Sequence, residues 1–280
     1  MTKYLLERIP TQDTKKKVNL FIIGEQKCGT TSLFNLLIQN KSVLAYKNKE
    51  CHYFNTCKID QDINYQQYHH NFRHPVYKRY HHILDASPDY LSDSSAFEKI
   101  FSYNPNAKII TILRNPVQRF ISAYNFYFSN IIQNIESVYE QYFQYTEKGK
   151  AEYAFLKQNR YLSIEDFFQK EVNGFSPIGA LKRGLYSQYL HPWEKVFDKK
   201  NRLLLIFERL TNPESMESEI NQLENFVHLS LKKTLPFKNT SFKKNKTPAK
   251  VIQLLEEYYF DEMKICQSLY GYDFTVSHLH

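Results

Sequence analysis

FIIGEQKCGTTSL, residues 21–33, is the stretch that decides how the chain folds. A mostly apolar run ends at Gly24, and after Gly29 the leucines at positions 33, 36 and 37 share one helical face. Two of the chain's seven glycines lie in this loop and allow the backbone to turn tightly. The first amides of a helix have no partner within the helix and carry the positive end of its dipole, so they attract an anion. The stretch therefore predicts a strand, a phosphate-binding loop and a helix.

The loop differs from a Walker A phosphate loop at one position that matters. A Walker A loop reads G-x-x-x-x-G-K-[ST], in which the lysine reaches the β- and γ-phosphates and the hydroxyl binds Mg²⁺. Gly24 and Gly29 keep that spacing, but Thr30 occupies the lysine position. The loop's own lysine, Lys27, comes before the second glycine. Such a loop suits one phosphate group better than a triphosphate with its metal.

The composition is that of a basic globular protein. The 280 residues are 42% hydrophobic and carry a net charge of +8, which suits anionic ligands, although a solvated lysine-rich surface is the commoner cause of such a charge. One α/β domain over residues 1–280 is the expectation for this length. No apolar run reads as a signal sequence or a membrane span. The four cysteines lack disulfide or zinc spacing, which fits a reducing, cytoplasmic location.

A second strand-to-helix junction follows residues 108–113. The sequence KIITIL reads as a buried strand, and Arg114 follows it directly. Asn115 is a good helix cap and Pro116 suits the first helical position. Ligands of open parallel sheets bind outside the carboxyl ends of the strands, so we expect both junctions to open on one edge.

The remaining pattern fits a mainly parallel sheet with helices. A short strand ending in a turn is expected within residues 83–90, another strand at 202–207, and helices at 93–103, 213–227 and 248–271. Residues 60–82 are expected to form a loop with short helical pieces. Residues 131–177 are amphipathic and aromatic without a strand signal, and we expect a helical insertion there that covers the cleft.

Five motifs occur in one order along the chain. They are residues 27–32 (KCGTTS), 49–54 (KECHYF), 87–90 (SPDY), 113–116 (LRNP) with Arg119 and Ser122, and 184–186 (GLY) with Trp193 and Glu208. In this order they resemble the motifs of sulfotransferases that use 3′-phosphoadenosine-5′-phosphosulfate (PAPS), in particular the heparan sulfate sulfotransferases and their bacterial relatives. The resemblance runs from about Val18 to Phe274 and is weakest across residues 131–177.

The resemblance implies a three-layer, P-loop-like α/β fold with a central, mainly parallel sheet. It also implies PAPS as the co-substrate and 3′-phosphoadenosine-5′-phosphate (PAP) as the product. No metal is expected, because one phosphosulfate group held by Lys27 and backbone amides does not need Mg²⁺. The 5′-phosphosulfate would lie on Lys27, Cys28, Gly29, Thr30, Thr31 and Ser32. The 3′-phosphate would lie on Arg114 and Ser122, and an arginine fork suits that dianion. The basic loop with Lys243 and Lys244 matches a segment that closes over the nucleotide.

The resemblance also implies the catalytic residues. Sulfuryl transfer requires an acceptor hydroxyl or amine to lose its proton as it attacks in line, and Glu50 matches the family's general base. His52 falls where the heparan sulfate enzymes carry a functional histidine, and is either the alternative base or an orienting residue. Lys27 is expected to stabilise the charge that builds on the leaving phosphate.

Two departures from the family pattern concern the acceptor. Ala86 stands where the glycosaminoglycan enzymes carry a lysine, and Asn55 stands where they carry an acidic residue. The aromatic insertion and the His- and Tyr-rich residues 65–82 suit a carbohydrate, a lipid or a phenol. The resemblance favours a carbohydrate or glycoconjugate acceptor, and no nucleic-acid partner is expected.

Two other functions fit parts of the sequence. A P-loop kinase or NTPase would share the loop, but Thr30 replaces its lysine and no convincing Walker-B acid follows a strand. A non-catalytic nucleotide- or polyanion-binding protein would explain the surplus of lysine. An intact candidate base, Glu50, beside both phosphate motifs argues against a protein without catalytic activity.

Overall fold

The computed structural model describes residues 11–12, 16–46, 49–55, 65–75, 78–141, 143–145, 147–236, 247–272 and 274. The chain forms two compact units and passes between them several times. The first unit comprises Met1–Glu25, Gly29–Leu113 and Leu190–Lys238, and the second comprises Gln26–Cys28, Arg114–Tyr189 and Asn239–His280. The single domain expected over residues 1–280 stays a prediction.

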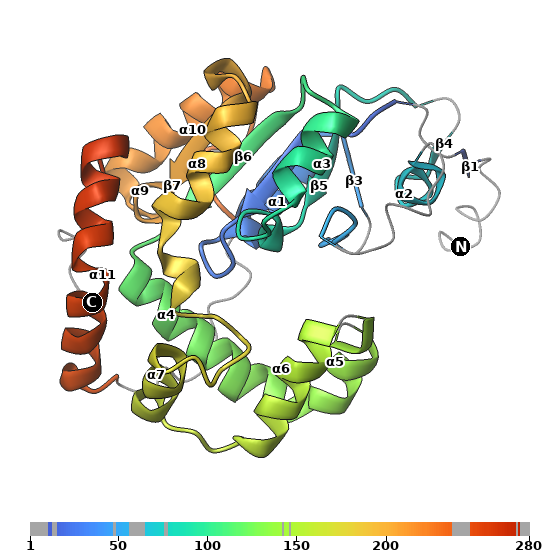
Figure 1. The fold of residues 1–280 in the computed structure, drawn as a ribbon. Helices are drawn as coiled ribbons and strands as arrows, with labels where there is room; N and C mark the ends of the chain where they lie inside the picture. The colour runs from blue at the N-terminus through green and yellow to red at the C-terminus, as the bar shows by residue number, and fades with distance from the viewer. Residues whose placement is uncertain are drawn as a thin grey trace. The chain divides into compact units, whose positions relative to one another are not determined.

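A five-stranded parallel sheet is the centre of the first unit (Figure 1). Its order is β3 (Val43–Ala45), β5 (His82–Ala86), β2 (Leu20–Gly24), β6 (Lys108–Leu113) and β7 (Arg202–Ile206), and every neighbouring pair runs parallel. The helices are α1 (Thr30–Ile38), α2 (Gln66–His70), α3 (Ala96–Tyr103), α9 (Phe207–Thr211) and α10 (Pro213–Val227), with 3-10 turns η4 (Pro88–Tyr90) and η9 (Lys199–Asn201). Two short strands, β1 (Thr11–Gln12) and β4 (His74–Pro75), pair antiparallel.

Burial explains why these segments form a parallel sheet. All residues of β2 and β5 are buried, and only the first residue of β6 is partly exposed. Strands that are covered on both faces read as nearly continuous apolar runs, which is the pattern of residues 20–24 and 108–113. The mainly parallel sheet predicted from the sequence is therefore confirmed.

The strand order brings to one edge of the sheet the ends of three strands that precede sequence motifs. From the central strand β2 the chain moves to β3 and β5 on one side, and then to β6 and β7 on the other. The carboxyl ends of β2, β5 and β6 consequently lie together where the order reverses, which is the usual ligand position in open α/β sheets. Phe21 pairs with Asp85 in β5 and with Ile109 in β6, which fixes the register of all three strands.

The second unit is helical within its described residues. Its elements are α4 (Pro116–Asn125), the π-helical turn η5 (Phe126–Ile131), η6 (Ile132–Asn134), α5 (Ile135–Gln141), η7 (Phe143–Tyr145), α6 (Glu147–Gln158), α7 (Ile164–Val172), η8 (Lys182–Gly184) and α11 (Ala249–Tyr270). Helix α8 (Tyr186–Val196) begins in this unit and continues along the chain into the first. The rings of Phe120 and Phe167 stack with centroids 5.3 Å apart, so α4 packs against α7. No helix in the described parts of the chain is long and apolar enough to cross a membrane.

Element bounds agree with the sequence prediction where the capping signals are strong. β6 and α10 have the predicted bounds, and α11 ends one residue before Gly271. The helix predicted from residue 93 begins at Ala96 instead, because the Asp93 carboxylate accepts from the amides of Ser95 and Ala96 and holds a turn before the helix, whose N-cap is Ser95. The insertion at residues 131–177 is helical where it is described, as predicted, and its position over a cleft stays a prediction. Strand β3 was not predicted, because three residues show no period.

Gly29 joins the phosphate loop to α1 in a conformation that other residues rarely adopt. Its φ is 95°, in the left-handed region, and it is the N-cap of α1. A β-carbon at this position would lie 2.5 Å from Cδ2 of Phe207, the first residue of α9. The start of α1 and the ring of Phe207 are therefore too close for any side chain between them.

Replacing Gly29 with alanine is expected to destabilise the protein more than the same change at Gly174. Both glycines have a left-handed φ, which costs an alanine about 1–2 kcal/mol. Only Gly29 lacks room for the added methyl group, and overpacking costs about 1–3 kcal/mol in addition. Urea unfolding of the two variants measures the difference. Equal losses would show that Phe207 moves aside without cost.

Candidate active site

The loop after β2 leads into a helix N-terminus that can bind an anion. Gly29 is the N-cap of α1 and has no side chain to cap the amides that follow. By helix geometry, the amides of Thr30, Thr31 and Ser32 have no partner within the helix. The Thr30 side chain is buried, whereas Thr31 and Ser32 are half-buried. No acidic residue lies in this first turn to repel an anion.

Lys27 lies in the same loop but belongs to the second unit. Its φ of 71° is left-handed, which is unusual for a lysine and typical of functional sites. Its ammonium lies 4.1 Å from the centroid of the Phe126 ring, at the start of the π-helical turn η5. The side-chain Nε2 of Gln26 donates to the hydroxyl of Tyr127, the next residue of that turn, at 3.3 Å. The π-helical turn therefore contacts both the loop and its cation, as such turns often do at functional sites.

Arg114 lies beside Lys27 in the second unit. Its Nη1 donates to the carbonyl of Lys27 at 3.3 Å, and the hydroxyl of Tyr186 donates to the carbonyl of Arg114 at 2.7 Å. The Cys28 thiol is buried, 3.8 Å from the Tyr186 hydroxyl, so Cys28 would contact a ligand through its backbone. The structure thus brings together one cation from each of the two strand-to-helix junctions.

The rest of the second junction supports the backbone. The Asn115 side chain accepts from the amide of Gln118 at 3.0 Å and caps α4, as predicted. Arg119 is fully buried and donates to the carbonyl of Ala180. Ser122 is half-buried, one turn further along α4. Lys243 and Lys244 lie outside the described residues, so their ligand role stays a prediction.

Glu50 lies between two basic side chains in the first unit. Its Oε1 is 2.7 Å from Nζ of Lys49, and its Oε2 is 3.5 Å from Nε2 of His52. The Glu50 side chain is 37% exposed and that of His52 is 24% exposed, so both can be reached from solvent. The expected base and its expected alternative are therefore direct neighbours.

The neighbours of Glu50 and His52 shift the pKa of each group. Burial alone would raise the pKa of Glu50, but the hydrogen bond with His52 and the charge of Lys49 outweigh it and lower the pKa to about 2. Burial alone would lower the pKa of His52, but the hydrogen bond with Glu50 and the charge of Asp89 raise it above its ordinary value. At neutral pH, Glu50 is therefore ionised, and His52 is protonated to a greater extent than a free histidine.

The backbone that carries this cluster is held in an unfavourable conformation. The φ angles of Lys49, Glu50 and His52 are 55°, 60° and 52°, all in the left-handed region. Residues held there cost of order 1–3 kcal/mol each and are concentrated at active sites. Hydrogen bonds from two of its amides connect the segment to the end of β5 and the residue that follows it. The Glu50 amide donates to the carbonyl of Ala86 at 3.1 Å, and the His52 amide donates to the hydroxyl of Ser87 at 3.0 Å.

A buried carboxylate anchors this arrangement. Asp85 accepts hydrogen bonds from the hydroxyls of Ser87 at 2.8 Å, Tyr68 at 2.9 Å and Tyr90 at 2.9 Å. Burial raises the pKa of Asp85, and the three hydroxyl donors only partly oppose that rise. Because the Ser87 hydroxyl also accepts from the amide of His52, Asp85 connects β5 to the segment that carries the candidate base.

The turn after β5 packs against the end of β2. The amides of Ser87 and Leu91 donate to successive carbonyls at the end of that strand, at 3.1 and 2.8 Å. A β-carbon on Gly24 would lie 2.8 Å from the carbonyl oxygen of Pro88. Within the first unit, the Glu50 cluster therefore rests on a turn that covers the last residues of β2, directly before the phosphate loop.

Sequence reasoning missed the roles of Tyr68, Asp85, Asp89 and Tyr90. Asp85 could have been found, because a carboxylate inside an apolar strand must have hydrogen-bond partners. Asp89 and Tyr90 belong to a motif that the sequence singled out, but the motif does not indicate which groups they contact. Tyr68 lies in a stretch without a clear period and gives no signal.

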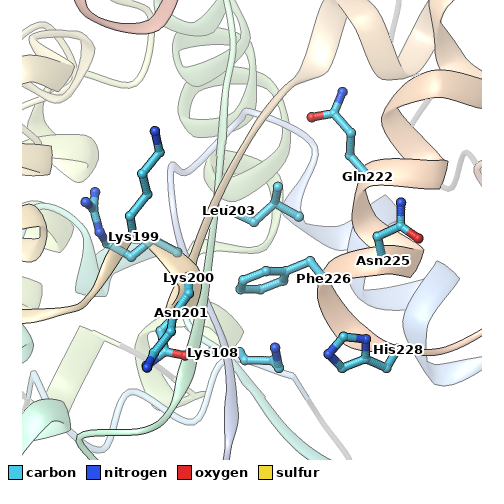
Figure 2. A pocket seen from close by; sticks show the side chains of 10 residues that line it. Lys108, Lys199, Lys200, Asn201, Leu203, Gln222, Asn225, Phe226 and His228 are labelled. Atoms are coloured by element: carbon cyan, nitrogen blue, oxygen red, sulfur yellow. The ribbon is translucent and has the colours of Figure 1, made fainter.

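A groove of about 630 Å³ lies elsewhere on the first unit (Figure 2). Lys108 and Arg202, which line it, are the first residues of β6 and β7, so the groove is at the amino ends of these strands and not at the phosphate-loop edge. Figure 2 shows Leu203 and Phe226 in its middle. The Lys108 ammonium lies 4.6 Å from the Phe226 ring centroid, and Arg202 pairs with Glu194 at 3.0 Å. Because the protein itself engages these cations, we assign the groove no ligand.

Comparison with known proteins identifies the family. Residues 17–269 match the family model of the sulfotransferase domain. The chain is 28% identical over 211 residues to heparan sulfate glucosamine 3-O-sulfotransferase 5 of Mus musculus, which covers 74% of this chain and 52% of that protein. It is 24% identical over 239 residues to carbohydrate sulfotransferase 15 of Homo sapiens, which covers 68% of this chain and 40% of that protein. The chain thus spans about half or less of the length of these curated relatives.

A solved structure shares the fold. The crystal structure of a sulfotransferase from Alicyclobacillus acidocaldarius superposes with a TM-score of 0.67 and 19% identity, over 92% of this chain and 97% of that one. The P-loop-like α/β fold that the sequence motifs predict is therefore confirmed. The family match over nearly the whole chain, on a fold that brings the strand-to-helix junctions to one edge of the sheet, shows that this chain belongs to the sulfotransferase family.

Proposed function

We propose that this protein transfers a sulfuryl group from PAPS to a hydroxyl or amine of an acceptor. The observation that most supports this proposal is the position of Glu50. Its ionised carboxylate lies between Lys49 and His52, on the turn that covers the end of β2. That strand leads directly into the loop that the family uses for the donor. A proton acceptor is thus positioned next to the strand end from which the donor loop departs.

The donor is proposed to bind through its two phosphate groups. The 5′-phosphosulfate is assigned to Lys27, to the backbone of residues 28–29 and to the amides and hydroxyls at the start of α1. The 3′-phosphate is assigned to Arg114 and Ser122, with Lys243 and Lys244 closing over the nucleotide. The proximity of Arg114 to the Lys27 backbone supports one anionic ligand that contacts both. A guanidinium can donate two parallel hydrogen bonds to one phosphate, which a lysine cannot.

The proposed reaction is a single in-line displacement at sulfur. The acceptor oxygen or nitrogen forms a bond to sulfur, and the bond between sulfur and the bridging phosphate oxygen breaks. The acceptor's proton passes to Glu50, and the electron pair of the broken bond stays on the 5′-phosphate of PAP. Lys27 and the first amides of α1 stabilise that developing charge. No metal is part of the proposal.

The pKa directions give Glu50 and His52 different charges before the reaction. A general base must be deprotonated before it accepts a proton, and Glu50 is ionised throughout the neutral range because its pKa is lowered to about 2. The raised pKa of His52 keeps a larger share of that ring protonated, and a protonated ring cannot accept the proton. We assign the base to Glu50 because it matches the family's general base and is already ionised, and we assign the orienting role to His52.

A carbohydrate or glycoconjugate is proposed as the acceptor. Both relatives described above are named as sulfotransferases of carbohydrates, which supports this class. Ala86, buried at the end of β5, provides no cation where the glycosaminoglycan enzymes carry a lysine. The acceptor is therefore proposed to carry less negative charge than a glycosaminoglycan.

PAP is expected to stabilise the protein against unfolding far more than AMP or ATP, without added Mg²⁺. PAP alone carries both of the phosphate groups that the two motifs are proposed to bind. At about one hundred times the dissociation constant, the stabilisation is about 2.7 kcal/mol. Thermal unfolding in the presence of each nucleotide measures it. Equal stabilisation by Mg-ATP would contradict the proposed donor.

Arg114→Ala is the matched variant for this measurement. Loss of a charge-assisted hydrogen bond is expected to weaken PAP binding by about 1.5–3 kcal/mol and to leave the weaker AMP binding nearly unchanged. Arg160→Ala removes an exposed arginine of the same unit and should affect neither nucleotide. Equal losses for PAP and AMP would show that Arg114 acts only by holding the carbonyl of Lys27.

Glu50→Gln is expected to lower the transfer rate at saturating PAPS by about 10²–10⁴-fold, the usual contribution of a general base. The amide keeps the shape of the side chain but cannot accept the proton, so PAP binding should be retained. His52→Gln should cost less, and Glu217→Gln, an exposed position on α10, should change nothing. Near-normal turnover of Glu50→Gln would remove Glu50 from the mechanism.

The pKa of Glu50 predicts how stability depends on pH. The folded value of about 2 is below the ordinary value of 4.5, so this carboxylate stabilises the fold above pH 4.5 and loses that effect as the pH falls toward 2. The difference in unfolding free energy between the wild type and Glu50→Gln should therefore shrink on acidification. Urea unfolding between about pH 2 and pH 6 measures it. A difference that does not depend on pH would show that Lys49 and His52 do not hold the carboxylate ionised.

A further inference from the structure

We propose that Asp89 is a positioning residue for the catalytic pair. Its carboxylate and that of Glu50 bracket the His52 imidazole, one at each ring nitrogen, and hold the ring charged and oriented beside the base. The inference deepens the proposed function and rests on it. Asp89 lies outside the segment that carries Glu50 and His52, so its role depends on how the chain folds.

Each ring nitrogen of His52 faces one carboxylate. Nε2 is 3.5 Å from Oε2 of Glu50, and Nδ1 is 3.8 Å from Oδ2 of Asp89. The two acids come from different parts of the first unit, since Asp89 lies in η4 after β5. Opposite charges at this range favour the charged form of a titratable group. The imidazole is therefore stabilised as a cation from both sides.

Asn55 contacts the same nitrogen but cannot supply the charge. Its side-chain amide lies 3.4 Å from Nδ1 of His52, so position 55 and Asp89 both face that side of the ring. A charged ring donates from Nδ1, and Asn55 can accept from it only through its oxygen, with the amide group turned over. The Asn55 amide is neutral, and its oxygen is buried without a hydrogen-bond partner in the described part of the chain. The related glycosaminoglycan enzymes carry an acidic residue at this position. In this protein the acidic group at that ring nitrogen comes from Asp89 instead.

The remaining charges near the ring do not cancel this effect. Lys49 opposes the charge on His52, but its ammonium pairs with the other oxygen of Glu50. Asp85, buried under the turn, adds a further negative influence on the ring. The side chains of His52 and Asp89 are only 24% and 33% exposed, so their attraction is less screened than that of surface groups. The raised pKa of His52 agrees with this balance.

A charged and fixed His52 serves the reaction in two ways. It holds the carboxylate of Glu50 in one orientation, so that the free electron pairs of the base stay directed to the acceptor. It also keeps its own proton while the acceptor's proton passes to Glu50, so the ring does not compete as a base. Asp89 touches neither substrate in this proposal and acts through His52.

NMR titration of the His52 ring in the intact protein tests the proposal without any substrate. The signals of the ring are assigned by their loss in His52→Gln. Asp89→Asn is expected to move the midpoint of the His52 titration to lower pH. Asp198→Asn, which removes an exposed acid of the same unit, should leave the midpoint in place. An unchanged midpoint in Asp89→Asn would overturn the proposal.

The double variant Asn55→Asp/Asp89→Asn gives a sharper test, because it moves the carboxylate from one segment to the other at the same ring nitrogen. Asp89→Asn alone should lower the transfer rate by up to about five-fold, the size of a partly exposed ion pair. The double variant is expected to restore both the midpoint and the rate. If Asp89→Asn folds poorly, Asn55→Asp alone should raise the midpoint. A transfer rate that stays low although the double variant restores the midpoint would refute the proposal that Asp89 acts through the charge of His52.

The two measurements separate this proposal from the proposed function. A lowered midpoint in Asp89→Asn, in a protein that transfers no sulfuryl group, would refute the function and leave the link between Asp89 and His52 in place. Sulfuryl transfer that Asp89→Asn does not change, together with an unshifted midpoint, would refute the link and leave the function in place.

Discussion

The parallel pairing of β2 with β5 and β6 is the constraint on which the rest of the structure depends. Parallel strands leave the sheet at the same edge, so three loops that are distant in sequence must start side by side. One of them is the phosphate loop, another begins with Arg114, and the third supports Glu50. The pairing is enforced by burial, because a shift of any of these strands would expose apolar residues or separate Asp85 from its donors.

The Asp85 carboxylate links the sheet to the candidate site through hydrogen bonds. A carboxylate inside a strand that is buried on both faces is acceptable only when hydrogen bonds compensate for the lost hydration. The three hydroxyls that do so come from α2 and from the turn after β5, and one of them also holds the amide of His52. The polar network thus fixes one arrangement of the site, which an apolar core could not specify so narrowly.

Much of this arrangement could be predicted from the sequence, but not the contacts that complete it. Strong signals such as the apolar run before Arg114 and the capping pair Asn115-Pro116 gave the strands, the helix starts and the motif positions. The proximity of Arg114 to Lys27 and of Asp89 to His52 depends on tertiary packing, which leaves no local pattern. The left-handed conformation of Lys49, Glu50 and His52 could not be predicted from the sequence either, because none of the three is a glycine or an asparagine.

That left-handed backbone has a consequence for how the protein changes under selection. Glycine fits such a conformation without strain, so glycine at Lys49, Glu50 or His52 would relieve a cost of order 1–3 kcal/mol. The same substitutions would remove the cation, the base or the imidazole. Selection for stability alone would therefore favour glycine only where the lost side-chain contacts stabilise the fold by less than that cost, whereas selection for turnover would retain the present residues.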